Sequence, residues 1–133
     1  MLIDDDKDEL SFFLDALIQV PCEDGFKCTY APNADQAVKM LKFLVPDFIF
    51  LDYRMPELNG LEFLSAVRNL VQLNKTKIYL YSAHTDEAIE RRAKQLGVKG
   101  CIKKMGSIKD LVDELKTVVT SPTPSVFYYS TEE

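Results

Sequence analysis

The segment Phe48–Leu51 is an unbroken apolar run that stops at the charged residue Asp52. A run without polar alternation is typical of a strand covered on both faces, as in a parallel sheet between two layers of helices. Parallel neighbours need long crossover connections, which are usually helices. The run therefore favours an α/β fold and places Asp52 at the carboxyl end of a buried strand.

Helical and extended patterns alternate along the chain. Pro21 and Gly25 follow the first helical pattern, and Asn33 and Ser107 stand at N-cap positions of later ones. Strands that alternate with helices in this order predict a (βα)5 three-layer sandwich with a central five-stranded parallel sheet. We predict strands at residues 1–3, 26–30, 48–51, 78–81 and 100–103, and helices at residues 10–18, 34–44, 61–71, 88–96 and 108–119.

Length and charge narrow the classes of function. The chain has 133 residues, within the size of one domain, and its 16 basic and 21 acidic residues give a formal net charge of −5. This acidity disfavours direct binding to nucleic acid or to a membrane surface. No apolar stretch approaches the ~20 residues that cross a bilayer, and residues 1–6 lack a secretory signal pattern. We expect one domain at residues 1–120, followed by a C-terminal tail or the start of a linker at residues 121–133.

The cysteines and the histidine exclude some chemistries. Cys22, Cys28 and Cys101 are odd in number and have no CxxC spacing, which favours free thiols over a disulfide framework or a zinc site. His84 is the single histidine of the chain. Schemes that need several histidines are therefore excluded, and a reducing compartment is expected.

Polar residues follow several of the predicted strands. In open α/β sheets, sites form at the carboxyl ends of the strands, where we expect these residues to converge. Neighbouring carboxylates repel one another, and a hard divalent cation such as Mg²⁺ resolves this repulsion while it bridges to phosphate oxygens. A hydroxyl and an ammonium opposite them suit the remaining phosphate oxygens. The residues concerned are Asp4, Asp5, Asp52, Ser82 and the pair Lys103-Lys104.

Each of these residues also has an ordinary explanation. The run Asp4–Asp6 suits a solvated helix start, Asp52 suits a turn, Ser82 suits a cap, and the lysines suit the surface. Their joint occurrence at strand ends favours a site that binds a phosphoryl group.

These residues resemble the receiver domain of bacterial two-component response regulators, from about Leu2 to Val119. Ser82 lies 30 residues and Lys104 lies 52 residues after Asp52, which is similar to the spacing in that family. The spacing favours Lys104 over its neighbour Lys103. The segments that carry the resemblance are Ile3–Asp6, Pro46–Pro56 with Asn59-Gly60, Tyr81–Ala83 and Lys104.

The resemblance implies a flavodoxin-like fold and a role for each site residue. Asp52 would accept a phosphoryl group, and Ser82 and Lys104 would bind its oxygens. Asp6 would begin a helix rather than bind metal. The expected ligands of Mg²⁺ are Asp4, Asp5, Asp52 and the backbone carbonyl of Arg54.

The resemblance also implies partners and a location. A sensor histidine kinase or phosphotransfer protein would donate the phosphoryl group, and a downstream effector domain or protein would read the result. The protein would be a cytoplasmic signalling switch that catalyses only its own phosphorylation and dephosphorylation; a homodimer stays open.

Two positions depart from the usual pattern of the family, and two others lie close in sequence to the expected site residues. Met105 follows Lys104 where the family usually has proline, and Cys101 stands where the family commonly has an aromatic switch residue. Arg54 and His84 stand two residues after Asp52 and Ser82. Arg54 and His84 either tune the lifetime of the phosphoryl group or are ordinary exposed side chains.

Other functions remain for this fold. A pseudo-receiver would bind proteins without phosphorylation. Cys101 and Met105 keep this alternative open, whereas four residues oppose it: Asp5, Asp52, Ser82 and Lys104. A hydrolase with a phosphoaspartate intermediate would need a general acid or base beside the nucleophile, which Tyr53-Arg54 does not offer. A flavodoxin-like cofactor binder would need a glycine-rich phosphate loop after the first strand, which the chain lacks.

Overall fold

The computed structural model describes residues 1–104 and 106–120. In this part of the chain the strands form one sheet with the order β2-β1-β3-β4-β5, and every neighbouring pair is parallel. The predicted α/β fold is therefore confirmed. The strands are β1 (Leu2–Ile3), β2 (Tyr30–Ala31), β3 (Phe48–Leu51), β4 (Lys77–Ser82) and β5 (Gly100–Lys103).

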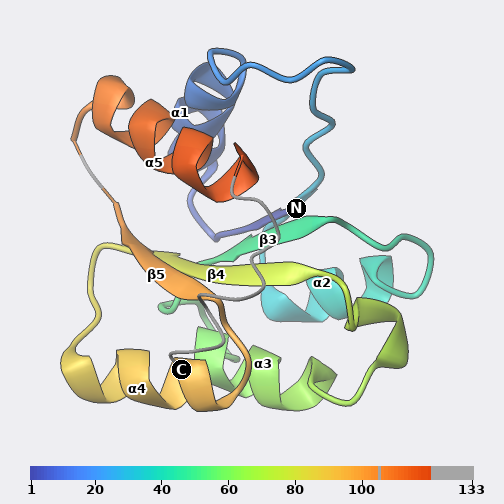
Figure 1. The fold of residues 1–133 in the computed structure, drawn as a ribbon. Coiled ribbons are helices and arrows are strands. Elements are labelled where there is room, and N and C mark those ends of the chain that lie inside the picture. Colours follow the sequence, from blue (N-terminus) through green and yellow to red (C-terminus); the bar gives the residue numbers. More distant parts are fainter. Residues whose placement is uncertain (105, 121–133) are drawn as a thin grey trace.

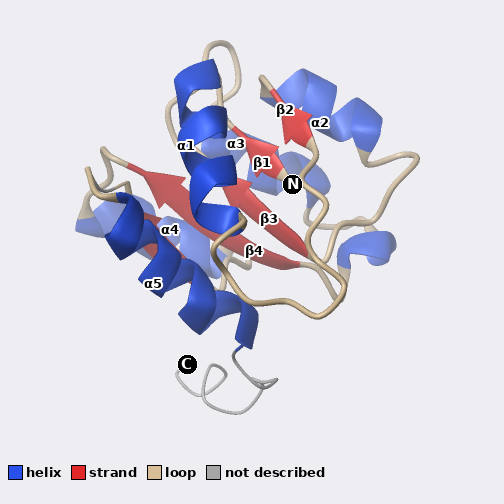
Figure 2. Cartoon of the chain, turned by 90° about the horizontal axis from the view of Figure 1, so that it is seen from above, coloured by secondary structure: helices blue, strands red, loops and turns tan. Residues whose placement is uncertain are grey.

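Helices cover both faces of the sheet. Figure 1 shows α1 and α5 on one side and α2, α3 and α4 on the other. In the view from above, α1 and α5 lie side by side over the strands (Figure 2), and they contact each other. The helices are α1 (Lys7–Leu17), α2 (Ala34–Met40), α3 (Gly60–Val67), α4 (Glu87–Gln95) and α5 (Ile108–Thr120), with a 3₁₀ turn η1 (Val71–Leu73) after α3.

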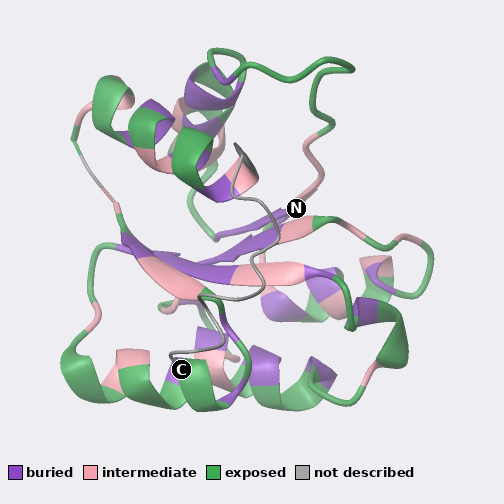
Figure 3. Cartoon of the chain, viewed as in Figure 1, coloured by how far each residue is buried: buried purple, intermediate pink, exposed green. Residues whose placement is uncertain are grey.

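The core is divided by the sheet into two apolar layers. Leu2 and Phe50 pack with α1 and α5, whereas their neighbours Ile3, Ile49 and Leu51 pack with the helices of the other side. This alternation follows from the period of two residues in a strand. The buried parts of the helices accordingly face the sheet, and their outer sides are exposed (Figure 3).

Side-chain caps fix the helix starts that follow the strands. Asp6 caps α1 by accepting a hydrogen bond from the backbone N–H of Asp8, and Asn33 caps α2 as predicted. Asn59 forms a capping box with Glu62 at the start of α3. Since each cap satisfies backbone donors that the helix cannot, it fixes where the chain leaves the strand end and enters the helix.

Three predicted elements differ most from the observed ones. The strand predicted at residues 26–30 is observed only as Tyr30–Ala31, because its neighbour β1 pairs with these two residues alone. The helix predicted to residue 44 ends at Met40, after which the backbone N–H groups of Lys42 and Phe43 donate to the carbonyl of the third preceding residue. The helix predicted at residues 61–71 ends at Val67.

The apolar face predicted for the first helix is only partly buried. Phe13 and Leu17 enter the core, but Leu14 is 38% exposed and Ile18 is 81% exposed.

Among the described residues, none of the helices has the length and apolar character that a membrane span requires. The tail or linker predicted at residues 121–133 lies outside the described residues.

Candidate phosphoacceptor site

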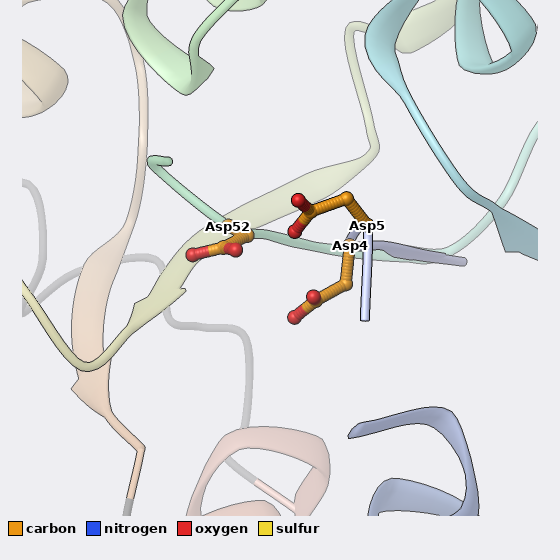
Figure 4. A group of neighbouring side chains, drawn as sticks. All are labelled: Asp4, Asp5 and Asp52. Atoms are coloured by element: carbon orange, nitrogen blue, oxygen red, sulfur yellow. The ribbon is translucent and has the colours of Figure 1, made fainter. Parts of the chain in front are cut away.

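The carboxyl ends of β1 and β3 bring three carboxylates together. Leu2 and Ile3 pair with Phe50 and Leu51, so the residues that follow these pairs are neighbours as well. The side chains of Asp4, Asp5 and Asp52 gather at this point (Figure 4), and each offers an oxygen that lies within 4.8 Å of the others.

Asp4 is held from several sides. Its side chain is fully buried; Oδ1 accepts a hydrogen bond of 3.0 Å from the backbone N–H of Asp6, and Oδ2 lies 2.7 Å from Nζ of Lys104. The bond to Asp6 turns the chain at the end of β1. Burial raises the pKa of the Asp4 carboxyl, and it outweighs the opposing effects of Lys104 and of the bond from Asp6.

Asp52 is buried between a hydroxyl and an ammonium. The Ser82 hydroxyl at the end of β4 donates a hydrogen bond of 2.9 Å to Oδ1, and Nζ of Lys104 lies 3.5 Å from Oδ2. Burial raises the pKa of the Asp52 carboxyl, and the charge of Asp5 adds to this effect. The Lys104 ammonium and the hydrogen bond from Ser82 oppose it. Both carboxylate oxygens of Asp52 therefore face a polar group that suits a phosphate oxygen.

Lys104, and not Lys103, reaches the site. The backbone N–H of Lys104 donates to the carbonyl of Ser82 at 3.1 Å, which fixes the end of β5 beside that of β4. Its side chain is 16% exposed, whereas Lys103 is exposed. Burial lowers the pKa of Lys104, but the hydrogen bond and the charges of Asp4 and Asp52 outweigh it, so the net pKa is raised and the lysine is charged.

The donor set fits a hard divalent cation. Among the described residues, Lys104 is the ammonium that pairs with Asp4 and Asp52, and the third carboxylate, Asp5, leaves an excess of negative charge. All three side chains offer oxygen ligands, and Asp5 is exposed and therefore accessible from solvent. An open hollow beside them is lined by Asp5, Tyr53, Arg54, Met55, Pro56 and Asn59, so Arg54 lies next to the acidic group.

Gly60 is a site residue that the sequence analysis did not single out. A Cβ atom at this position would lie 2.8 Å from the carbonyl oxygen of Asp52, closer than real contacts allow, and 3.1 Å from Cα of Tyr53, a tight contact. The backbone N–H of Gly60 also donates to the carbonyl of Tyr53 at 2.8 Å. The start of α3 therefore lies directly against the backbone that carries Asp52; the Asn59-Gly60 pair was the only local signal.

Three of the remaining predicted positions lie around this centre. Arg54 and His84 are exposed. Cys101 is half buried and, with Ser82 and Glu90, lines a small cavity beside β5. Met105 lies outside the described residues.

Known proteins share both the sequence pattern and the fold. The family model of the response regulator receiver domain matches residues 1–116. The chain belongs to the response regulator receiver family. Receiver domains are signalling switches rather than classical enzymes, so the predicted family and class of function are confirmed.

Individual relatives of this receiver domain differ in length. A probable chemotaxis protein CheY from Rhizobium etli is 29% identical over 119 residues, which cover 89% of each chain. A probable transcriptional regulatory protein NarL from Mycobacterium tuberculosis is 34% identical over 82 residues, 62% of this chain but 37% of the relative. The chain thus spans well under half of NarL.

A solved structure covers the matching part of that second relative. The signal receiver domain of the putative response regulator NarL from Mycobacterium tuberculosis superposes with a TM-score of 0.73 at 26% identity. The superposition covers 90% of this receiver domain and 94% of the NarL domain. The similarity therefore concerns the receiver part of NarL.

Proposed function

We propose that this receiver domain is a switch controlled by phosphorylation of Asp52. One observation carries the proposal: the two carboxylate oxygens of Asp52 face the Ser82 hydroxyl at 2.9 Å and the Lys104 ammonium at 3.5 Å. A hydroxyl and an ammonium beside one nucleophilic carboxylate are the groups that would bind and neutralise a transferred phosphoryl group.

The proposed transfer is a displacement at phosphorus. A carboxylate oxygen of Asp52 attacks the phosphorus of a phosphohistidine donor and forms an O–P bond. The P–N bond breaks, its electron pair stays on the imidazole nitrogen, and that nitrogen takes up a proton. Ser82 donates a hydrogen bond to one phosphoryl oxygen and Lys104 pairs with another; catalysis is mainly positioning and charge neutralisation. Water later hydrolyses the acyl phosphate and restores the Asp52 carboxylate.

A magnesium ion is part of the proposal. Asp4, Asp5, Asp52 and the backbone carbonyl of Arg54 would hold it, and the excess of carboxylates over ammonium groups supports this set. When bound, Mg²⁺ neutralises negative charge on the phosphoryl oxygens. Asp6 stays outside the set because it caps α1.

Ser82 offers a route from Asp52 to the molecular surface. Its Oγ lies 3.5 Å from the backbone N–H of His84, in the loop that leads to α4. The same loop is tied to α4 by a hydrogen bond of 2.9 Å from Thr85 to Glu90. Movement of Ser82 toward a phosphoryl group would therefore shift this loop and bias a partner surface on α4, β5 and α5.

The proposed partners follow from family membership. A sensor histidine kinase or phosphotransfer protein would supply the phosphoryl group, and an effector domain or protein would bind the switched surface. Cytoplasmic location, dimerisation and the tuning roles of Arg54 and His84 stay predictions.

Intact-mass measurement after incubation with Mg²⁺ and a small phosphodonor tests the function. We expect the mass of one phosphoryl group on the wild type and on Asp15→Asn, which removes an exposed carboxylate on α1. We expect no gain on Asp52→Asn or without Mg²⁺. A wild type that gains no mass would instead support the pseudo-receiver, which binds proteins without phosphate.

A further inference from the structure

Tyr81 is a buried polar side chain that the proposed chemistry does not use. It follows Leu80 on β4 and, unlike Ser82, packs in the layer of α1 and α5, where it is fully buried. Its hydroxyl donates a hydrogen bond of 2.8 Å to Oε1 of Glu9 on α1, and its ring lies 5.8 Å from the ring of Phe13. The ring is therefore fixed at both ends.

The ring lies beneath the ammonium of the site. Nζ of Lys104 is 5.6 Å from the centroid of the Tyr81 ring, within the ~6 Å at which a cation is attracted to an aromatic face. The same ammonium lies 2.7 Å from Asp4 and 3.5 Å from Asp52. Lys104 is thus bounded by two carboxylates and by an aromatic floor.

We propose that Tyr81 and Glu9 are positioning residues that hold the Lys104 ammonium where it reaches Asp52. The inference rests on the proposed function for the role of Lys104 in phosphoryl transfer, but not for its contact with Tyr81. Lysine is a point charge on a flexible four-carbon stem, so its position depends on what surrounds the stem and the ammonium. The aromatic face limits the ammonium on one side, and Glu9 fixes the orientation of that face.

Conservative variants separate this role from ordinary packing. Tyr81→Phe removes only the hydroxyl, whereas Tyr81→Leu removes the aromatic face. Glu9→Gln keeps an acceptor for the hydroxyl, and Glu9→Leu removes it. Tyr79→Phe is the matched control, because Tyr79 is a buried tyrosine on the same strand and in the same layer.

The first measurement is spectroscopic and needs no phosphorylation. The ε-methylene signal of Lys104, identified by its loss in Lys104→Arg, is recorded by NMR on lysine-labelled protein. An ammonium over a ring face has neighbouring protons shifted upfield by the ring current. We expect this shift in the wild type, Tyr79→Phe and Tyr81→Phe, and its loss in Tyr81→Leu.

The second measurement is the rate of Asp52 phosphorylation by a small phosphodonor. We expect the limiting rate to fall about 3-fold in Tyr81→Phe and Glu9→Leu, since one hydrogen bond is lost. A fall of about 10-fold is expected in Tyr81→Leu. Glu9→Gln and Tyr79→Phe should stay close to the wild type, and the donor concentration at half-saturation should change little.

Three results would overturn the inference. They are an Lys104 signal without an upfield shift in the wild type, limiting rates that do not change in Tyr81→Phe and Glu9→Leu, and losses in Tyr79→Phe equal to those in the Tyr81 variants. Should Tyr81→Leu fail to fold, Tyr81→Phe and Glu9→Leu still decide the matter. A wild type that takes up no phosphoryl group refutes the proposed function, and the Lys104 signal then tests the positioning alone.

Discussion

The ammonium of Lys104 lies 2.7 Å from Oδ2 of Asp4, a carboxylate with no exposure to solvent. Oδ2 of Asp52 lies 3.5 Å from the same ammonium. A single cation thus pairs with two buried carboxylates that would otherwise repel each other. The electrostatic balance of the site depends on this lysine before any ligand is bound.

Removal of that cation should destabilise the fold. We expect Lys104→Met to lower the free energy of unfolding at pH 7 by about 3 kcal/mol, because a buried charge loses its partner. The loss should shrink in acid, where Asp4 takes up a proton. Urea unfolding at pH 7 and pH 4 measures both effects. Lys103→Met is the matched control, since this neighbour is exposed and should change stability by less than about 0.5 kcal/mol; equal losses in the two variants would contradict the prediction.

The ionised side chain of Asp52 should lower the stability of the folded protein at neutral pH. Burial raises its pKa above the ordinary carboxyl value, so the folded protein binds this proton more tightly than the unfolded chain does. The free energy of unfolding therefore falls as the pH rises from the ordinary pKa of aspartate through the raised pKa of Asp52. The loss of stability is complete at pH values above both. We expect Asp52→Asn to be more stable than the wild type at pH 7 by about 1 kcal/mol.

Denaturant titrations over pH check the sign of this effect. The advantage of Asp52→Asn should disappear as the pH falls below about 3.9, the ordinary value for aspartate. Asp15→Asn is the control, because its carboxylate is exposed. An Asp52→Asn protein that is less stable than the wild type at pH 7 would contradict this prediction. It would show that Lys104 and Ser82 stabilise the carboxylate by more than burial destabilises it.

The sequence predicted elements best where polarity changes abruptly. Phe48–Leu51 has the predicted bounds, because the apolar run stops at Asp52. Gly100–Lys103 also has the predicted bounds. The strand at residues 26–30 was predicted too long because a strand also needs a partner, and β1 pairs only with Tyr30–Ala31. Pairing is a long-range property that local pattern does not contain.

The same distinction applies to the site. Parallel strands bring their carboxyl ends to one edge, so position in the chain was enough to bring Asp4, Asp52, Ser82 and Lys104 together. The contact between Tyr81 and Glu9 joins residues 72 positions apart and depends on how α1 packs on the sheet. No local signal predicts it. The Asn59-Gly60 pair was a local signal for the glycine, but it does not predict the tight approach of Gly60 to Asp52.

Gly60 should tolerate no side chain. A Cβ atom there meets backbone atoms of Asp52 and Tyr53 at 2.8 and 3.1 Å, and backbone cannot rotate away as a side chain can. We expect Gly60→Ala to lower the free energy of unfolding by about 2 kcal/mol, measured by chemical denaturation. In Gly100→Ala the new atom meets only the Tyr79 ring at 3.5 Å, an ordinary contact. A Gly60→Ala protein as stable as this control would refute the close approach.

The three cysteines should differ in reactivity. Burial, with the charge of Glu90 adding to it and that of Lys94 opposing it, raises the pKa of Cys101 to about 11. At pH 8 only about one Cys101 in a thousand is then a thiolate, the reactive form. Iodoacetamide should therefore alkylate the exposed Cys22 long before Cys101, as peptide mass spectrometry at timed intervals would show. Rapid labelling of Cys101 in a Cys22→Ser protein would contradict this order.

Mg²⁺ should stabilise the folded protein through the acidic group at the ends of β1 and β3. A ligand that binds only the folded state raises the free energy of unfolding by about 2.7 kcal/mol at 100 times its dissociation constant. We expect a higher unfolding midpoint with Mg²⁺ than with NaCl of equal ionic strength. The gain should be much smaller in Asp5→Asn and unchanged in Asp15→Asn. Because the pKa values of Asp4 and Asp52 are raised, protons compete with the cation already in mild acid, and the gain should fade as the pH is lowered. A gain that Asp5→Asn retains in full would place the cation elsewhere on the protein.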